Sequence, residues 1–166
     1  MTGLIFLVVF GLLQLLCLFF GVKEERKQLS RVFTQNYKEL RKIYPTPLYT
    51  WRFLSGDLCT KRWYNNLTFK ASLKLDVYND MLIVSEYGKG LCLRYDQCVL
   101  KHTQAFLFHD LVFKNLPVQE QSTSSAFIGR IDLGHRVDLR VCLSEKKLNI
   151  ILKQAQKGGG CSSSIP

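Results

Sequence analysis

The chain has 166 residues, of which 47% are hydrophobic, and a formal net charge of +10. This length allows one domain of ordinary size after an apolar segment, and a core of that size does not depend on disulfide bonds. All 23 Lys and Arg and all 13 Asp and Glu follow Val22, so the positive charge belongs to the rest of the chain and favours acidic partners, either anionic lipid headgroups or nucleic acid.

Residues 4–22 form the first predicted element, with 15 Leu, Ile, Phe or Val and no charged side chain. A helix of about 20 residues covers about 30 Å, the thickness of a bilayer core. A helix in a soluble core is rarely apolar on every face over five turns. A cleaved signal peptide fits less well, because residues 1–3 carry no basic side chain and Gly21-Val22-Lys23 is a poor cleavage site. We therefore predict a short N-terminus at 1–3 and a retained transmembrane helix at 4–22.

The charges that flank this segment predict its orientation. Lys23, Arg26, Lys27 and Arg31 follow it directly, and no Lys or Arg precedes it. The positive-inside rule then predicts a single-pass protein of the inner or plasma membrane with its domain in the cytoplasm. An odd number of cysteines after the segment agrees with reduced cytosolic thiols. These four cations are the candidate contacts to anionic lipid, and an exported, periplasmic-facing domain is the alternative topology.

Residues 23–44 are predicted to form a basic amphipathic stalk helix that ends before Pro45. Six apolar residues recur at helical spacing on one face: Leu29, Val32, Phe33, Tyr37, Leu40 and Tyr44. This face either packs on the following domain or lies on the membrane surface. We expect packing, since aromatic residues in such a stripe usually belong to a core.

From Leu48 onward the hydrophobic period changes to two, which predicts half-buried antiparallel strands. Turn residues divide this region into seven candidate strands, at 48–55, 69–78, 81–86, 90–95, 105–113, 126–132 and 136–143. A C-terminal amphipathic helix follows Ser144, which is a good N-cap, and ends at Lys157 before a glycine. The domain is therefore expected at 48–157, with a flexible tail at 158–166.

Seven strands followed by one amphipathic helix resemble the element order of the pleckstrin-homology-like barrel. The fold class implied is mainly β (α+β), with an antiparallel barrel closed by the C-terminal helix. A second resemblance is to small uncharacterised bacterial proteins with one hydrophobic segment. It rests on Gly90-Leu91-Cys92-Leu93, on His102 and on the apolar stretch AFLFHDLVF, and it carries no activity over to this chain.

The sequence gives no convincing catalytic or metal-binding motif. Cys98 and His102 are four residues apart and are the best candidates for a nucleophile and its base, but no oxyanion donor accompanies them. Neither Cys-x-x-Cys nor His-x-x-x-His occurs, so no zinc site is expected. We expect no enzyme activity and no cofactor; an enzyme or enzyme accessory domain that uses Cys98 and His102 is the alternative.

A binding role at the membrane remains. Lys61, Arg62, Lys70 and Lys74 are the candidate ligand face of the domain, for anionic lipid headgroups or another membrane protein. The stretch KRWYNN also has the basic and aromatic composition of a single-strand nucleic-acid site. Beside a membrane segment its residues are more simply interfacial, so nucleic acid is not the expected partner.

Overall fold

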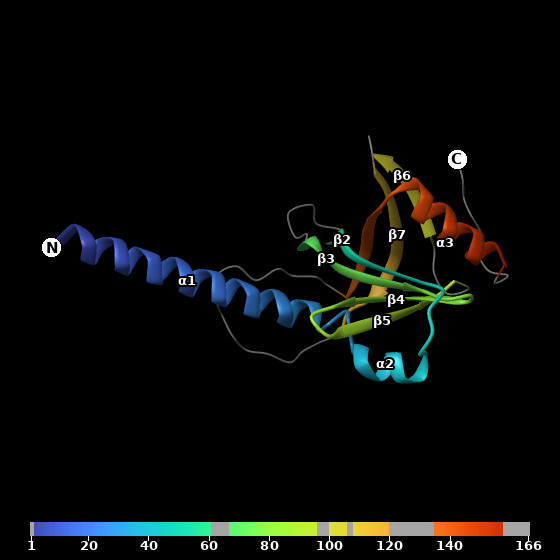
Figure 1. Ribbon diagram of the computed structural model, residues 1–166, viewed down its shortest axis with the longest axis horizontal. Coiled ribbons are helices and arrows are strands. Elements are labelled where there is room, and N and C mark those ends of the chain that lie inside the picture. Colours follow the sequence, from blue (N-terminus) through green and yellow to red (C-terminus); the bar gives the residue numbers. More distant parts are fainter. Residues whose placement is uncertain (1, 61–66, 96–99, 106–107, 120–134, 158–166) are drawn as a thin grey trace.

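The structure is a computed structural model and describes residues 2–60, 67–95, 100–105, 108–119 and 135–157. A long helix projects from a domain built of one curved sheet and two shorter helices (Figure 1). In chain order the elements are α1 (Thr2–Leu29), β1 (Gln35–Asn36), α2 (Tyr37–Ile43), β2 (Tyr49–Cys59), β3 (Leu67–Val77), β4 (Met81–Glu86), β5 (Lys89–Arg94), β6 (Leu100–Ala105), β7 (Phe108–Pro117), β8 (Arg136–Leu143) and α3 (Glu145–Lys157).

The strands form a single antiparallel sheet in the order β1-β5-β4-β3-β2-β8-β7-β6. Strand β2 joins its two halves, because β2 pairs with β3 along its length while only Gly56–Cys59 also pair with β8. Its register with β3 shifts twice between Trp51 and Gly56, and such irregularities bend a strand. As a result β6 and β7 run steeply across β3, β4 and β5 (Figure 1).

The mainly β fold with a C-terminal helix is confirmed, but the closed seven-stranded barrel is wrong. A barrel closes only when its two edge strands pair with each other. Here β1 lies at one edge and β6 at the other, and the sheet is open over the residues that the structure describes. Helix α3 packs against β7. It covers the core on the side that the open sheet leaves uncovered.

Two predicted strands, 81–86 and 136–143, have the observed bounds of β4 and β8. The single strand expected at 105–113 is instead the junction of β6 and β7, which pair as a hairpin. The stretch AFLF contains no Gly, Pro, Asn or Asp, so the sequence gives no signal for that turn. The strand expected at 126–132 lies outside the described residues.

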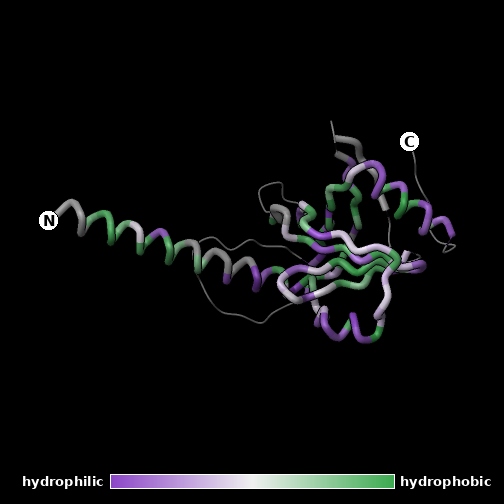
Figure 2. Tube along the Cα trace, in the orientation of Figure 1, coloured by the Kyte–Doolittle hydropathy of each residue, from purple (hydrophilic) through white to green (hydrophobic). Residues whose placement is uncertain are grey.

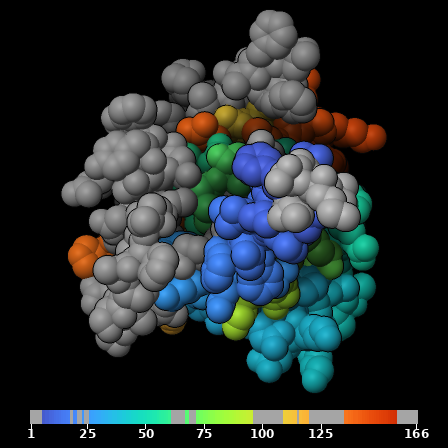
Figure 3. All heavy atoms as spheres, turned by 90° about the vertical axis from the view of Figure 1, so that its left-hand side faces the viewer, coloured from blue at the N-terminus to red at the C-terminus, as the bar shows by residue number. Residues whose placement is uncertain are grey.

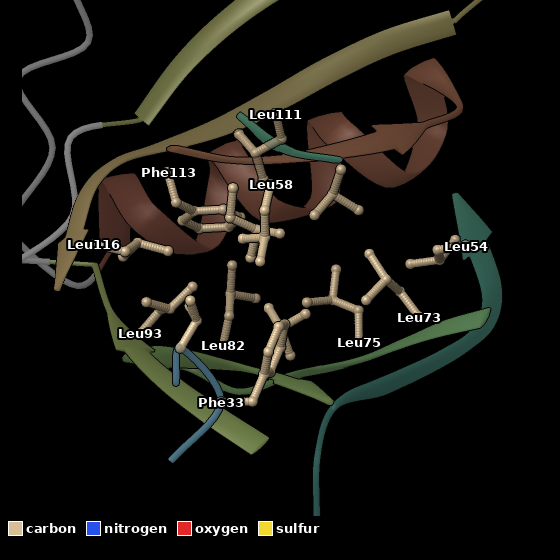
Figure 4. Packing of buried hydrophobic residues seen from close by; sticks show 14 of the residues in the cluster. Phe33, Leu54, Leu58, Leu73, Leu75, Leu82, Leu93, Leu111, Phe113 and Leu116 are labelled. Carbon is tan, nitrogen blue, oxygen red and sulfur yellow. The ribbon is translucent and has the colours of Figure 1, made fainter. Parts of the chain in front are cut away.

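The main core lies between the inner face of the sheet and α3. Leu58 of β2, Leu82 of β4 and Phe113 of β7 meet there (Figure 4). Helix α3 closes this core with three buried residues, Leu148, Ile151 and Ala155. Phe33, which follows α1, is fully buried in the same core. The segment after α1 is therefore part of the folded domain.

Helix α2 covers the opposite face of the sheet. Leu40 packs there with Tyr78, Met81 and Ile83 in a second, smaller cluster. All six residues of β4 are buried, because alternate side chains face the main core and α2. This explains why the first four residues of β4, 81–84, are all apolar, as in strands covered on both faces.

The continuous stalk helix predicted over 23–44 is interrupted in the structure. Helix α1 ends at Leu29, and tight turns carry the chain through Val32 into the core before α2 begins. The Asn36 side chain accepts a hydrogen bond from the Lys38 backbone N–H and caps α2. Helical spacing alone does not reveal this break, because residues on both sides of it bury apolar side chains.

Helix α1 includes the segment for which a transmembrane helix is predicted. Its N-terminal part is predominantly hydrophobic and its last two turns next to the domain are more hydrophilic (Figure 2). Among the residues that the structure describes, no helix has the length and apolar character needed to cross a membrane, so the predicted transmembrane helix is not found there.

Candidate functional site

The outer part of α1 exposes apolar side chains in every direction. Successive helical residues are about 100° apart, so the five residues 6–10 alone span the full circumference. The exposed apolar side chains between residues 6 and 20 are between 49% and 70% accessible: Phe6, Leu7, Val8, Val9, Phe10, Leu12, Leu13, Leu15, Leu16, Phe19 and Phe20. A helix with no polar face is suited to an apolar environment.

The inner end of α1 is locked to the domain. Gln28 and Leu29 are buried, and the Phe33 backbone N–H donates to the Leu29 carbonyl at 2.8 Å. In the segment after β7, the Gln119 backbone N–H donates to the Arg31 carbonyl at 2.9 Å. The apolar helix is thus continuous with a segment whose position the core determines.

The four cations predicted to contact lipid are placed differently around this junction. Lys23 is exposed, and Lys27 is half-exposed. Arg31 is engaged within the fold: its Nε donates to the Gln119 carbonyl at 3.2 Å and its Nη1 to the Gln28 Oε1 at 3.0 Å. Arg31 therefore helps to fix α1, while Lys23 and Arg26 have exposed side chains.

Arg26 contacts the turn between β4 and β5. Its guanidinium carbon lies 4.6 Å from the centre of the Tyr87 ring. Tyr87 and Gly88 both have positive φ, 46° and 78°, as a two-residue type I′ hairpin turn requires. The Tyr37 backbone N–H donates to the Gly88 carbonyl at 3.0 Å and holds the turn against the start of α2.

This arrangement brings basic and aromatic side chains to one end of the domain. Seen along α1, the β4–β5 turn lies beside the base of the helix (Figure 3). Tyr87 and Lys89 are exposed there, as are Lys23 and Arg26. The predicted strands at 81–86 and 90–95 imply a turn between them, but nothing in the sequence indicates that this turn meets Arg26.

A polar network centred on the buried Asp76 lies under α2. The Asp76 side chain is fully buried and accepts two hydrogen bonds of 2.7 Å, from the Tyr37 and Thr50 hydroxyls. Arg41 lies 4.0 Å from the same carboxylate and donates to the Tyr78 hydroxyl at 3.1 Å. Asp76 does point away from the main core, but α2 covers that face.

Lys74, predicted for the ligand face, belongs to this network. Its Nζ lies 3.8 Å from Asp76 and donates to the Tyr37 hydroxyl. Burial lowers the pKa of Lys74, and burial followed by the hydrogen bond to Asp76 raises the pKa of Tyr37. The raised pKa keeps the Tyr37 hydroxyl protonated as a donor to Asp76, and the network attaches α2 to the sheet.

The other three residues of the predicted ligand face are not placed by the structure. Lys61 and Arg62 lie outside the described residues, and Lys70 lies in β3 with a side chain that is not described. Of the four, Lys74 is the one whose side chain the structure describes, and it lies beside Asp76.

The cysteines that the structure describes in the domain are held as thiols. Cys142 donates to Asp110 Oδ1 at 3.0 Å, and burial, reinforced by this bond and the charge of Asp110, raises the pKa of Cys142 to about 11. Burial also raises the pKa of Cys59 and of Cys92. A neutral thiol is a weak nucleophile.

The structure does not test the alternative site at Cys98 and His102. Cys98 lies outside the described part of the chain, and His102 lies in β6 with a side chain that is not described. Within the described ranges, no three His, Cys, Asp or Glu side chains are grouped so that they could hold a metal ion. Comparison with protein-family models, curated proteins and solved structures finds no match for this chain.

Proposed function

We propose that the protein is a membrane-anchored binding protein without catalytic activity of its own. In this proposal α1 inserts its apolar segment into a lipid bilayer and holds the sheet domain at the membrane surface. The observation that carries the proposal is the exposure of apolar side chains on all faces of α1, together with the burial of Leu29 and Phe33 at its inner end.

Transfer energies support insertion of α1. Each Leu, Ile, Phe or Val contributes about −0.3 to −0.6 kcal/mol at the centre of a membrane helix, so 15 of them sum to roughly −5 to −9 kcal/mol. The one strongly polar residue of the segment, Gln14, costs on the order of 2 kcal/mol. Both energies use values for the helix centre. Even the smaller apolar sum exceeds the cost of Gln14, so the total favours insertion.

The domain supports a binding role better than a catalytic one. The buried Asp76 and the partly buried Tyr37 hold α2 on the sheet, and the described thiols of the domain are kept protonated. The basic residues next to α1 suit acidic partners at the membrane surface. By the positive-inside rule they also favour a cytoplasmic location for the domain.

A double substitution in α1 tests the anchor. We expect Leu12→Arg/Leu16→Arg to move the protein from the membrane fraction to the soluble fraction, because two arginines cost about 5–7 kcal/mol at the helix centre and cancel the gain from the apolar residues. The matched control, Leu12→Ala/Leu16→Ala, should remain in the membrane after alkaline carbonate extraction. If wild-type protein is released by carbonate, insertion of α1 is disproved.

A reporter fusion tests the side of the membrane on which the domain lies. A fluorescent reporter that matures only in the cytoplasm should be active when it is fused after Pro166, and a reporter that folds only outside the cytoplasm should be inactive there. The opposite pattern would assign the domain to the exported side, even if α1 is inserted.

A further inference from the structure

The contact between Arg26 and Tyr87 fixes the depth of the β4–β5 turn relative to the apolar part of α1. The apolar segment ends at Val22, and Arg26 follows four residues later in the same helix. At 1.5 Å per residue, this separation is about 6 Å along the helix axis. The Tyr87 ring, which lies under the Arg26 guanidinium, is held near the same level.

This depth corresponds to the headgroup layer of a bilayer. The hydrocarbon core is about 30 Å thick and the whole bilayer about 40–45 Å, so each headgroup layer is roughly 5–8 Å deep. If the apolar part of α1 occupies the hydrocarbon core, then Arg26 and the β4–β5 turn lie among the headgroups. Tyrosine is enriched at this level, because its ring is apolar and its hydroxyl is polar.

The side chains at the turn have the chemistry for a phosphate. Tyr87 is 46% exposed, and Lys89 beside it is also exposed. The cation–π contact places the Arg26 guanidinium carbon over the Tyr87 ring, and the N–H groups of a guanidinium can also donate to phosphate oxygens. Glu24 and Glu25 lie in the same segment of the chain, so the local excess of positive charge is small. Phosphate binding at this turn therefore depends on the positions of Arg26 and Lys89.

The position of the turn is set independently of lipid. Tyr37 holds Gly88 through its backbone N–H, and Glu86 pairs with Lys89 across the hairpin. On the helix side, Leu29 and Phe33 fix the end of α1 in the core. The turn and the end of α1 are therefore held in place before lipid binds. This lowers the entropic cost of binding.

We propose that Arg26, Tyr87 and Lys89 form a second membrane contact, which binds the phosphate groups of anionic phospholipids. This inference rests on the proposed insertion of α1 and adds the lipid class and the residues that recognise it. The contact directs the end of the sheet at the β4–β5 turn toward the bilayer and the opposite end, where Tyr49 lies, away from it.

Lysine footprinting of the full-length protein in nanodiscs tests the contact. The lysines are acetylated by a neutral reagent and quantified by mass spectrometry, in discs of phosphatidylcholine alone and in discs that also contain phosphatidylglycerol. We expect Lys89 to be acetylated about fivefold more slowly in the anionic discs, since one lysine near an anionic surface gains about that factor in occupancy. Lys42 and Lys146, which are exposed on other parts of the domain, should react equally in both discs.

Substitutions identify the residues responsible. Arg26→Ala and Tyr87→Ala should each return Lys89 to the rate seen in neutral discs. The control Tyr49→Ala removes an equally exposed tyrosine at the other end of the sheet and should leave the protection of Lys89 intact. Unchanged protection in both Arg26→Ala and Tyr87→Ala would overturn the assignment of these residues.

The remaining outcomes separate the two proposals. If α1 is inserted but Lys89 reacts as fast as Lys42 in anionic discs, the second contact is disproved and the anchor stands. Equal protection in both kinds of disc, or protection produced in neutral discs by inorganic phosphate, would disprove recognition of anionic lipid. Failure of the protein to enter nanodiscs through α1 would instead disprove the proposed function.

Discussion

The carboxylate of Asp76 connects three elements through two hydroxyl groups. Tyr37 of α2 and Thr50 of β2 both donate to it, and Asp76 itself lies in β3. The charge is buried, and the cations of Arg41 and Lys74 lie within 4.0 Å of it. Such a charge is tolerated because its hydrogen-bonding capacity is used and opposite charges are near.

Asp76→Ala should lower the free energy of unfolding by about 1.5–3 kcal/mol, because it removes the charged acceptor of the Tyr37 and Thr50 hydroxyls. Urea unfolding in a mild detergent measures this change. The control Asp57→Ala removes a carboxylate that lies 4.0 Å from the largely exposed Arg140, and such a pair contributes about 0–1 kcal/mol. Equal effects of the two substitutions would contradict the structural role of Asp76.

Cys142 gives a pH-dependent contribution with a defined sign. Its pKa in the folded protein is about 11, raised from an ordinary value of 9.0, so the fold favours the protonated thiol. Its stabilising contribution is complete below about pH 9 and is lost as the pH rises from 9 to 11. Cys142→Ser keeps a hydroxyl donor for Asp110 but does not titrate in this range. Stability should therefore fall more steeply between pH 9 and 11 in the wild type than in the variant; equal slopes would disprove this contribution.

At the scale of elements, β2 depends on a glycine where the two halves of the sheet meet. Gly56 pairs with Phe69 of β3 on one side and with Val141 of β8 on the other. A Cβ at this position would overlap the Arg140 carbonyl oxygen and lie 2.8 Å from Leu73 Cδ1. Because the Arg140 oxygen belongs to the backbone, it cannot move aside as a flexible side chain can.

Gly56→Ala should therefore destabilise the domain by about 1–3 kcal/mol, as overpacking of a well-packed site does. Thermal unfolding followed by the circular dichroism of the sheet measures the change. Gly11→Ala is the matched control, since a Cβ there meets nothing within 4 Å and the helix itself gains from alanine. An unchanged melting temperature for Gly56→Ala would mean that β2 and β8 can separate at this point without cost.

Strand and helix periodicity predicted most of the domain, because its residues follow simple burial patterns. In β8, Val137, Leu139, Val141 and Leu143 are buried in strict alternation. The pattern failed where a second covering element changes the environment. Asp76 occupies an outward position of β3, as its alternation predicts, but a single strand cannot reveal that α2 will cover that face.

The site was less accessible to sequence reasoning than the fold. The basic residues after the apolar segment were evident, yet the separate environments of Arg26 and Arg31 depend on contacts with Tyr87 and Gln119, more than 50 residues away in the chain. Such pairings follow from the path of the sheet. No local pattern in a single sequence encodes them.

For the molecule as a whole, the residues after α1 are part of the core. Leu29, Val32 and Phe33 are each at most 2% exposed, and full burial of such a side chain contributes about 1.5–3 kcal/mol. Their sum is comparable with the total stability of a typical domain, about 5–15 kcal/mol. A domain boundary drawn at the prolines after α2 would remove this contribution.

A fragment that begins at Gln28 should therefore fold, whereas one that begins at Pro45 should not. The shorter fragment lacks Leu29 and Phe33 as well as Tyr37, one of the two hydroxyl donors to Asp76. Dispersion of amide signals in NMR spectra distinguishes the two outcomes. Within the longer fragment, Phe33→Ala should cost about 3–5 kcal/mol. A well-dispersed spectrum from the Pro45 fragment would show that the sheet and α3 are sufficient.

The buried junction between α1 and the sheet also has a mechanical consequence. If α1 is inserted as proposed, the helix would act as a rigid lever whose pivot lies in the bilayer, because no flexible linker separates it from the sheet. Membrane helices tilt by about 20° on average, and such a tilt moves a point 30 Å from the pivot sideways by about 10 Å. Changes in bilayer thickness that alter the tilt would therefore swing the whole domain across the membrane surface.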